Sequence, residues 1–111
     1  MPAAEFLIEH MGRTLRDPVD PRRIGSLDPK LRSRVNGEIY RFAGPATRER
    51  FERNPVRWCG LVRDPVSGVC FVPDRWSPRL DWVDGPYFFT SDSTRLAFSR
   101  NPLNFAISRD Y

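Results

Sequence analysis

The sequence has few of the residues that most often carry chemistry, with one histidine and two cysteines among 111 residues. The two cysteines, Cys59 and Cys70, lie eleven positions apart and form no CxxC pair. A GxSxG nucleophile motif, a P-loop and a glycine-rich dinucleotide fingerprint are also absent. Because no catalytic arrangement can be assembled from what remains, we expect a protein that is not an enzyme and uses no cofactor.

The sequence also lacks long apolar runs. No segment approaches the stretch of about 20 apolar residues that a membrane span needs. The short apolar stretch near the start is interrupted by Glu5, Glu9 and His10, and no basic region precedes it, so it does not resemble a signal peptide. The expectation is a cytoplasmic protein without a membrane segment. In a reducing compartment Cys59 and Cys70 are expected to be buried thiols, with a disulfide or a shared soft-metal site as alternatives.

Lysine is nearly absent, since Lys30 is the only one among 18 basic residues. The formal net charge is +4. A composition that is rich in arginine and poor in lysine has a plain explanation in the coding bias of a GC-rich genome, and an anionic partner is the alternative. Aromatic residues, in contrast, make up 13% of the chain and can supply large buried areas. The composition therefore indicates a folded domain.

The chain contains an internal repeat at an offset of 47 residues. The segment YFFTSDSTRLAFSRNP from Tyr87 follows an earlier version, YRFAGPATRERFERNP from Tyr40. Between positions 16 and 55, 13 residues are identical to those 47 positions later, including the Asp-Pro-Val at Asp17 and again at Asp64. Random pairing would give about 2 to 3 identities. Each copy is too short to bury a stable core alone, so the copies should pack on each other.

Turn and helix signals divide each copy into a hairpin and a helix. Asn36-Gly37 and Asp84-Gly85 are turn pairs between strand-like runs, and the second pair falls one residue late relative to the offset, which predicts a local change of pairing. Helices are predicted between Gly44-Pro45 and Asn54-Pro55, between Ser91 and Asn101-Pro102, and over residues 2–11, with a strand, turn and strand over 60–72.

The predicted architecture is an α+β fold in which two repeated hairpin-plus-helix units pack about a pseudo-twofold, with an extra N-terminal helix. Residues 1–15 form that helix, 16–60 the first copy and 61–111 the second, together one compact domain. The expected framework of the core is the repeated aromatic set Tyr40, Phe42, Phe51, Tyr87, Phe89 and Phe98.

The repeated pattern is similar to that of the YHS domain family. The second copy matches nearly the whole motif through Asp64-Pro65-Val66-Ser67-Gly68, Tyr87, Phe89, Ser91, Phe98, Asn101-Pro102 and Phe105. The first copy repeats its second half through Tyr40, Phe42, Arg48-Glu49-Arg50-Phe51, Asn54-Pro55 and Trp58. The resemblance implies two β-hairpin-plus-helix units. It also implies an association with metal handling, since the family occurs with heavy-metal-handling proteins, copper-transporting pumps and the large subunits of diiron monooxygenases.

Both copies depart from the family at the positions of its metal-type cysteines. Those positions hold Asp20, Ala43 and Thr47 in the first copy, and Ser67, Thr90 and Thr94 in the second. Hydroxyl groups are neither anionic nor polarisable near neutral pH, so they do not replace thiolates as soft-metal ligands. We therefore expect no metal site. The residual candidates Cys59, Cys70 and His10 follow no known ligand spacing.

The resulting hypothesis is a non-catalytic accessory or protein-interaction module, which the family resemblance associates with a metalloenzyme or monooxygenase system. Its expected partner is a protein, for instance a metalloenzyme subunit, and a homo-oligomer also fits. Trp76 and Trp82 are candidates for the contact surface, or else for a core that the copies share. A copper- or zinc-binding or trafficking protein is the competing hypothesis.

A nucleic-acid-binding module is a second alternative. It rests on basic residues close to aromatic ones, a mixture that contacts phosphates and bases. The residues are Arg41, Arg48, Arg50, Arg53 and Arg57 around Phe42, Phe51 and Trp58. Because the aromatics belong to the predicted core and Glu49 and Glu52 balance two arginines, a solvated helix face explains this stretch better.

Overall fold

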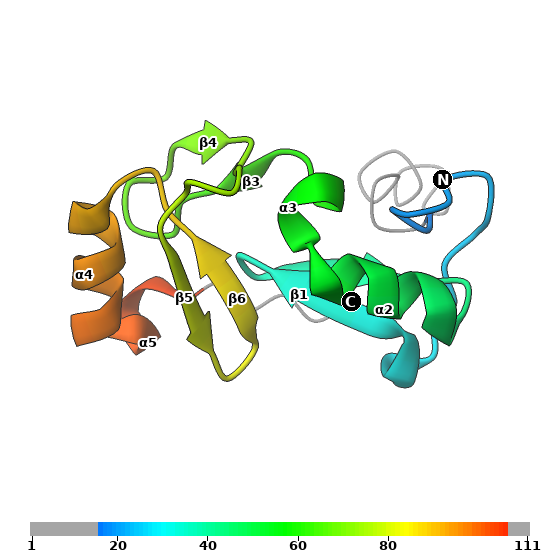
Figure 1. The fold of residues 1–111 in the computed structure, drawn as a ribbon. Coiled ribbons are helices and arrows are strands. Elements are labelled where there is room, and N and C mark those ends of the chain that lie inside the picture. Colours follow the sequence, from blue (N-terminus) through cyan, green and yellow to red (C-terminus); the bar gives the residue numbers. More distant parts are fainter. Residues whose placement is uncertain (1–15, 107–111) are drawn as a thin grey trace, which may run out of the picture. The chain divides into compact units, whose positions relative to one another are not determined.

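The computed structural model describes residues 16–106 and divides into two compact units. Unit 1 comprises residues 16–33 and 39–54 of the described chain, and unit 2 comprises 34–38 and 55–106. Small antiparallel hairpins and short helices make up both, which confirms the expected α+β class (Figure 1). The helix expected over residues 2–11, and His10 with it, lie outside the described residues.

The order of elements follows the repeat. The first copy contains a 3₁₀ helix η1 (Pro29–Leu31), strands β1 (Arg32–Val35) and β2 (Glu38–Arg41), and helices α2 (Pro45–Arg53) and α3 (Pro55–Trp58). The second contains strands β3 (Val62–Arg63), β4 (Cys70–Phe71), β5 (Arg79–Trp82) and β6 (Gly85–Phe88), and helices α4 (Asp92–Arg100) and α5 (Pro102–Phe105). The bounds of β1, β2, α2 and α3 each return 47 positions later, in β5, β6, α4 and α5.

The predicted helix ends are confirmed, and local chemistry explains them. In unit 2, Ser91 caps α4 because its hydroxyl oxygen accepts a hydrogen bond from the Thr94 backbone N–H. In unit 1, α2 begins with Pro45, which needs no partner for a backbone N–H at the first helical position. Both helices end at an asparagine, Asn54 or Asn101, whose backbone folds away from the helical conformation before the next proline.

The first hairpin turn forms as predicted, whereas the prediction for the second is wrong. Asn36 and Gly37 adopt positive φ angles of 50° and 77°, as a type I′ turn requires. In the second hairpin Trp82 pairs with Gly85, so the turn is Val83-Asp84 and the offset of 47 is kept without a slip. Gly85 instead begins β6 at a φ of 122°, where a Cβ atom would lie only 2.7 Å from the Arg34 carbonyl oxygen.

Each unit has an aromatic cluster beneath its helix. In unit 2 the ring of Phe98 on α4 lies 4.6 Å from that of Tyr87 and 5.5 Å from that of Phe89, all three fully buried. Figure 1 shows α4 on one side of the β5–β6 hairpin that carries Tyr87. In unit 1 the ring of Phe51 lies 5.0 Å from that of Tyr40 and 5.1 Å from that of Phe42.

The tip of the first hairpin is part of unit 2, where both the backbone and the side chain of Asn36 hold it. Asn36 is 1% exposed, and its amide nitrogen donates to the carbonyl oxygens of Arg63 and Phe88, both at 2.9 Å. Its amide oxygen accepts from the Phe88 backbone N–H at 2.7 Å. The amide thus satisfies backbone groups on the outer edge of β6 that β5 does not reach. The sequence had suggested only a turn role for this residue.

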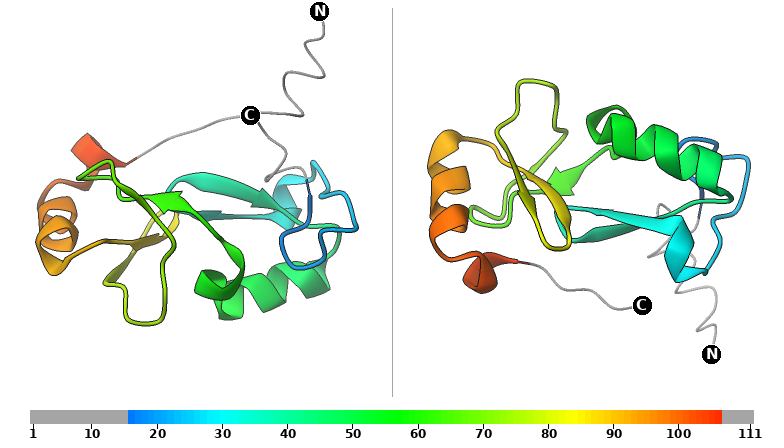
Figure 2. Two further views of the ribbon diagram at one scale, coloured as in Figure 1. Left: turned by 90° about the horizontal axis from the view of Figure 1, so that it is seen from above. Right: turned by 60° about the horizontal axis from the view of Figure 1, so that its bottom comes forward.

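The segment between β4 and β5 is the longest irregular stretch of unit 2, and both views in Figure 2 show it extending away from the strands that flank it. Pro73 at its start is buried, and the carbonyl oxygen of Pro78 at its end accepts from the Phe89 backbone N–H at 2.9 Å. The loop is therefore anchored at both ends. Within residues 16–106, none of the helices is long and apolar enough to cross a membrane.

Candidate functional site

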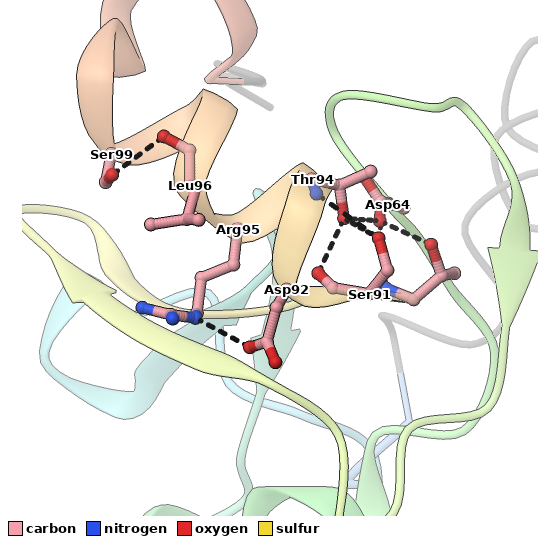
Figure 3. A network of polar contacts seen from close by, with 8 residues as sticks. Asp64, Ser91, Asp92, Thr94, Arg95, Leu96 and Ser99 are labelled. Atoms are coloured by element: carbon pink, nitrogen blue, oxygen red, sulfur yellow. Dashed lines mark hydrogen bonds and ion pairs between the residues drawn. The ribbon is translucent and has the colours of Figure 1, made fainter.

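The most connected polar group of unit 2 is the carboxylate of Asp64, shown in Figure 3. Its Oδ1 atom accepts hydrogen bonds from the backbone N–H groups of Val66 at 2.8 Å and Ser67 at 3.1 Å, which folds the turn after β3. Its Oδ2 atom accepts from the Thr90 backbone N–H and hydroxyl, both at 2.9 Å, and from the Thr94 hydroxyl at 2.7 Å. Asp64 therefore ties the β3–β4 turn to the start of α4.

Asp17 makes the corresponding network in unit 1. Its Oδ1 atom accepts from the backbone N–H groups of Val19 at 2.9 Å and Asp20 at 3.1 Å. Its Oδ2 atom accepts from the Ala43 backbone N–H at 3.0 Å and the Thr47 hydroxyl at 2.5 Å. Every one of these donors has its counterpart 47 positions later around Asp64. The additional donor in unit 2 is the Thr90 hydroxyl, which Ala43 cannot supply.

In each network, three of the four donor residues occupy the positions where the family resemblance led us to look for cysteines. Asp20, Ala43 and Thr47 converge on Asp17, and Ser67, Thr90 and Thr94 converge on Asp64. Sequence reasoning marked these positions as lost ligands but missed the aspartate at their centre. The available signal was the identity of Asp17 with Asp64 and of Thr47 with Thr94 at one offset.

The two carboxylates are ionised more readily than ordinary aspartates. Burial raises the pKa of Asp64, but the hydrogen bonds from Thr90, Thr94, Ser67 and Val66 outweigh it, so the pKa lies below the usual aspartate value. Burial likewise raises the pKa of Asp17, and hydrogen bonds led by that of Thr47 lower it below the usual value. Each carboxylate is therefore held as an anion at neutral pH.

The Asp64 carboxylate is poorly suited to bind a metal or to act as a base. A carboxylate offers about four lone-pair positions, and five donor contacts converge on this one. A cation or a substrate proton would have to displace donors that are already in place. The arrangement instead braces the fold, by joining segments that lie 26 to 30 residues apart in the chain.

The metal-ligand candidates do not form a cluster in the described part of the chain. Cys59 is a buried thiol, as expected, and its Sγ lies 3.6 Å from the Gly60 carbonyl oxygen. The same expectation is wrong for Cys70, whose thiol is exposed on the two-residue strand β4. His10 lies outside the described residues. Among residues 16–106, no three histidine, cysteine or acidic side chains come together as metal ligands would.

The structure places the two tryptophans named as contact candidates in different environments. Trp82 on β5 packs edge-on against Tyr87 and Phe98, at ring distances of 6.3 Å and 5.9 Å, and adjoins the core of unit 2. Trp76 lies in the loop between β4 and β5 and is 77% exposed. Trp82 is half-buried, and Trp76 is the more exposed of the two.

Hydrogen bonds fix the backbone beneath Trp76. The Asp74 carboxylate accepts from the Trp76 backbone N–H at 2.8 Å, and the Ser77 hydroxyl oxygen accepts from the Asp74 N–H at 3.0 Å. The Ser77 N–H in turn donates to the Asp74 carbonyl oxygen at 3.1 Å. The guanidinium of Arg75 stacks on the indole, 4.7 Å from its centre. The exposed ring is therefore held on a preformed turn.

The basic and aromatic residues that could suggest a nucleic-acid surface are mostly engaged elsewhere. Phe42 and Phe51 are buried, so their faces cannot stack on bases. On α2, ion pairs join Arg48 to Glu52 at 3.2 Å and Arg53 to Glu49 at 2.5 Å. This helix presents paired charges to solvent, and its positive charge is largely balanced.

Comparison with known proteins adds no relative to this picture. No family model matches the chain, and neither a curated protein nor a solved structure is similar to it at a significant level. The geometry described above therefore carries the functional argument.

Proposed function

We propose that this protein is a non-catalytic interaction module that uses the loop between β4 and β5 to bind a protein partner. The observation that carries the proposal is the exposure of Trp76 on a backbone held by Asp74 and Ser77. Tryptophan is the residue type most enriched among the side chains that dominate binding energy. A side chain that is ordered before binding loses less conformational entropy when a partner covers it.

The surroundings of Trp76 support a protein partner. Val69, just before β4, and Val72, at the start of the loop, are also largely exposed. The segment that leads to Trp76 therefore offers further apolar surface. The charged guanidinium of Arg75 stacks on one face of the indole and so lies beside the exposed ring. An apolar centre with a polar rim is the usual composition of protein interfaces.

We further propose that the chain is a degenerate tandem of two YHS-like units, arranged about a pseudo-twofold axis. The shared element bounds, the matched aspartate networks and the two aromatic clusters support a duplication. A fused pair can reproduce in one chain what a symmetric homodimer makes from two. Residual dipolar couplings measured on the β1–β2 and β5–β6 amides would test the axis, since a twofold requires the two hairpins to differ in orientation by about 180°.

The association with a metalloenzyme or monooxygenase system rests on the family resemblance, and it names the class of partner to look for. In this proposal Asp17 and Asp64 keep the shape of the unit, because each carboxylate already receives hydrogen bonds from the positions where ligands would be needed. The module would then contribute a surface to such a system and no metal of its own.

Photo-crosslinking in the native host tests the interaction surface. A photoreactive phenylalanine analogue would replace Trp76 in one variant and Val83 in another, since Val83 is also highly exposed but lies on the β5–β6 turn. We expect one protein to be cross-linked at position 76 and not at position 83. Equal cross-linking at both positions, or none at position 76, would contradict the proposed surface.

Elemental analysis separates this proposal from a soft-metal protein. Protein purified from medium supplemented with copper, zinc and iron should contain less than stoichiometric metal, and Cys59→Ser and Cys70→Ser should not change that content. One bound metal per chain that disappears in either cysteine variant would establish the metal-binding alternative.

A further inference from the structure

Two arginines face each other at the open end of the first hairpin. The Phe42 backbone N–H donates to the Leu31 carbonyl oxygen at 2.9 Å, which sets the register of the antiparallel pair β1–β2. In this register Arg32 lies directly opposite Arg41. Side chains at opposite positions of an antiparallel pair project from the same face and lie close together. The hairpin therefore places these two arginines next to each other on one face in unit 1.

Arg41 is unusual for a charged residue because it is only 3% exposed. Its Nε atom is buried and makes no hydrogen bond within the described part of the chain. Among residues 16–106, no carboxylate forms an ion pair with Arg41 or with Arg32. Arginine stays protonated in proteins, so the buried guanidinium cannot relieve its charge by losing a proton.

The equivalent place in unit 2 is built differently. There Arg79 pairs with Phe88, and its guanidinium lies 5.5 Å from the centre of that ring. The same guanidinium donates to the Asp81 carboxylate at 2.8 Å. In the second copy, Arg79 therefore contacts both an aromatic ring and a carboxylate. The first copy has arginine in place of that phenylalanine, at Arg41, and places no aspartate at the position of Asp81.

A pair of like charges without an acid is unfavourable, and more so when one of them is buried. An anion bound between the two groups would offset this repulsion. Guanidinium groups present several N–H donors in a plane and bind carboxylate or phosphate oxygens through paired hydrogen bonds. Because Arg41 is nearly inaccessible, a small group with its own oxygens fits the site better than an extended polymer.

We propose that Arg32 and Arg41 form a binding site for a single oxyanion of the carboxylate or phosphate type. The anion would bridge the two guanidinium groups and accept from the buried Nε of Arg41. The anion would be a free ion from solution. This site is independent of the Trp76 surface.

Thermal unfolding with added anions tests this site. We expect inorganic phosphate, titrated at constant ionic strength against chloride, to raise the Tm of the wild type by several degrees and to saturate. Arg32→Met and Arg41→Met should lose this saturable rise. Arg79→Met is the matched control, since Arg79 is the counterpart of Arg32 at the offset of 47, and it should keep the rise. General salt effects would appear equally in all variants.

A direct signal keeps the test valid even if Arg41→Met folds poorly. In the wild type, the Nε–Hε resonance of Arg41 should shift on titration with phosphate, while that of Arg79 should not. If phosphate changes neither the Tm nor the Arg41 resonance of the wild type, the proposal is overturned.

Discussion

The aspartate networks of the two units share a plan but differ in completeness. Asp17 receives four donor contacts, from two turn amides, the Ala43 amide and the Thr47 hydroxyl. Asp64 receives five, because Thr90 adds a hydroxyl where the first copy has Ala43. The shared part indicates which contacts the fold needs. The first copy lacks this contact, and the Asp17 carboxylate is still buried and hydrogen-bonded.

Removing the charge of either aspartate should have the largest effect on the free energy of unfolding. Asp64→Asn would turn one acceptor oxygen into a donor that faces N–H and hydroxyl donors, and we expect a loss of about 3 to 5 kcal/mol in the free energy of unfolding. Asp17→Asn should cost about 2 to 4 kcal/mol, since fewer donors are left without an acceptor.

Urea denaturation followed by circular dichroism measures both losses. Asp81→Asn is a suitable control because this aspartate is exposed and forms a surface ion pair with Arg79. It should cost at most about 1 kcal/mol. A loss at position 64 no larger than at position 81 would show that the network does not stabilise the fold.

Acid should remove the same stabilisation without mutation. Because the folded-state pKa of each carboxylate is lowered, the unfolded chain binds protons first as the pH falls. The stabilisation is complete above the ordinary aspartate pKa of about 3.9 and is lost as the pH falls from there through the lower folded-state values. Urea midpoints measured between neutral pH and pH 3 should decrease with acid in the wild type. The decrease should be smaller in Asp64→Asn, and an equal slope in both proteins would rule out this source of the pH dependence.

The two hairpin tips offer a second comparison. Asn36→Ala would leave the backbone N–H and carbonyl of Phe88 without their side-chain partners, and we expect a loss of about 2 to 3 kcal/mol. Val83→Ala at the counterpart position should change stability by about 0.5 kcal/mol or less, since Val83 is 87% exposed. Hydrogen exchange would locate the effect: the Phe88 amide should lose protection in Asn36→Ala. Retained protection of that amide would mean that the Asn36 side chain does not hold it.

The smallest expected effect isolates the donor that distinguishes the networks. Thr90→Ala converts the unit 2 network to the composition of unit 1 and should cost only about 1 kcal/mol, because Asp64 keeps the Thr90 backbone contact and its other donors. Thr94→Val removes a hydroxyl that both copies share and should cost about 1 to 2 kcal/mol. Chemical denaturation resolves the order. A larger loss for Thr90→Ala would show that the additional donor is not dispensable.

The amino-acid sequence was sufficient to find the elements of the fold. Proline and asparagine at fixed spacing, with serine or glycine at the start, mark both helices because these residues limit the backbone locally. The Asn36-Gly37 turn follows from the same kind of local preference. The second turn was misplaced because Gly85 was assigned a turn role. A glycine is required at position 85 because the Arg34 carbonyl oxygen lies where a Cβ atom would be. That contact joins residues far apart in the chain.

The candidate sites depended on contacts that no local pattern reveals. The repeat at an offset of 47 identified Asp17, Asp64, Thr47 and Thr94 as equivalent, yet only the folded chain shows that each threonine donates to its aspartate across 30 residues. The sequence likewise names Trp76 and Trp82 as two similar aromatics. Packing buries part of one against Tyr87 and leaves the other on an exposed turn.

What the sequence determined by itself was the internal repeat, the order of strands and helices, and the aromatic residues that alternate into each core. The elements and the core residues follow from short-range sterics and side-chain periodicity. What only the tertiary structure decided was the burial of Arg41 opposite Arg32, the role of Asn36 on β6 and the saturation of the two carboxylates. Burial and hydrogen-bond partners depend on which distant segments of the chain meet. That environment sets how much each hydrogen bond or charge contributes to stability.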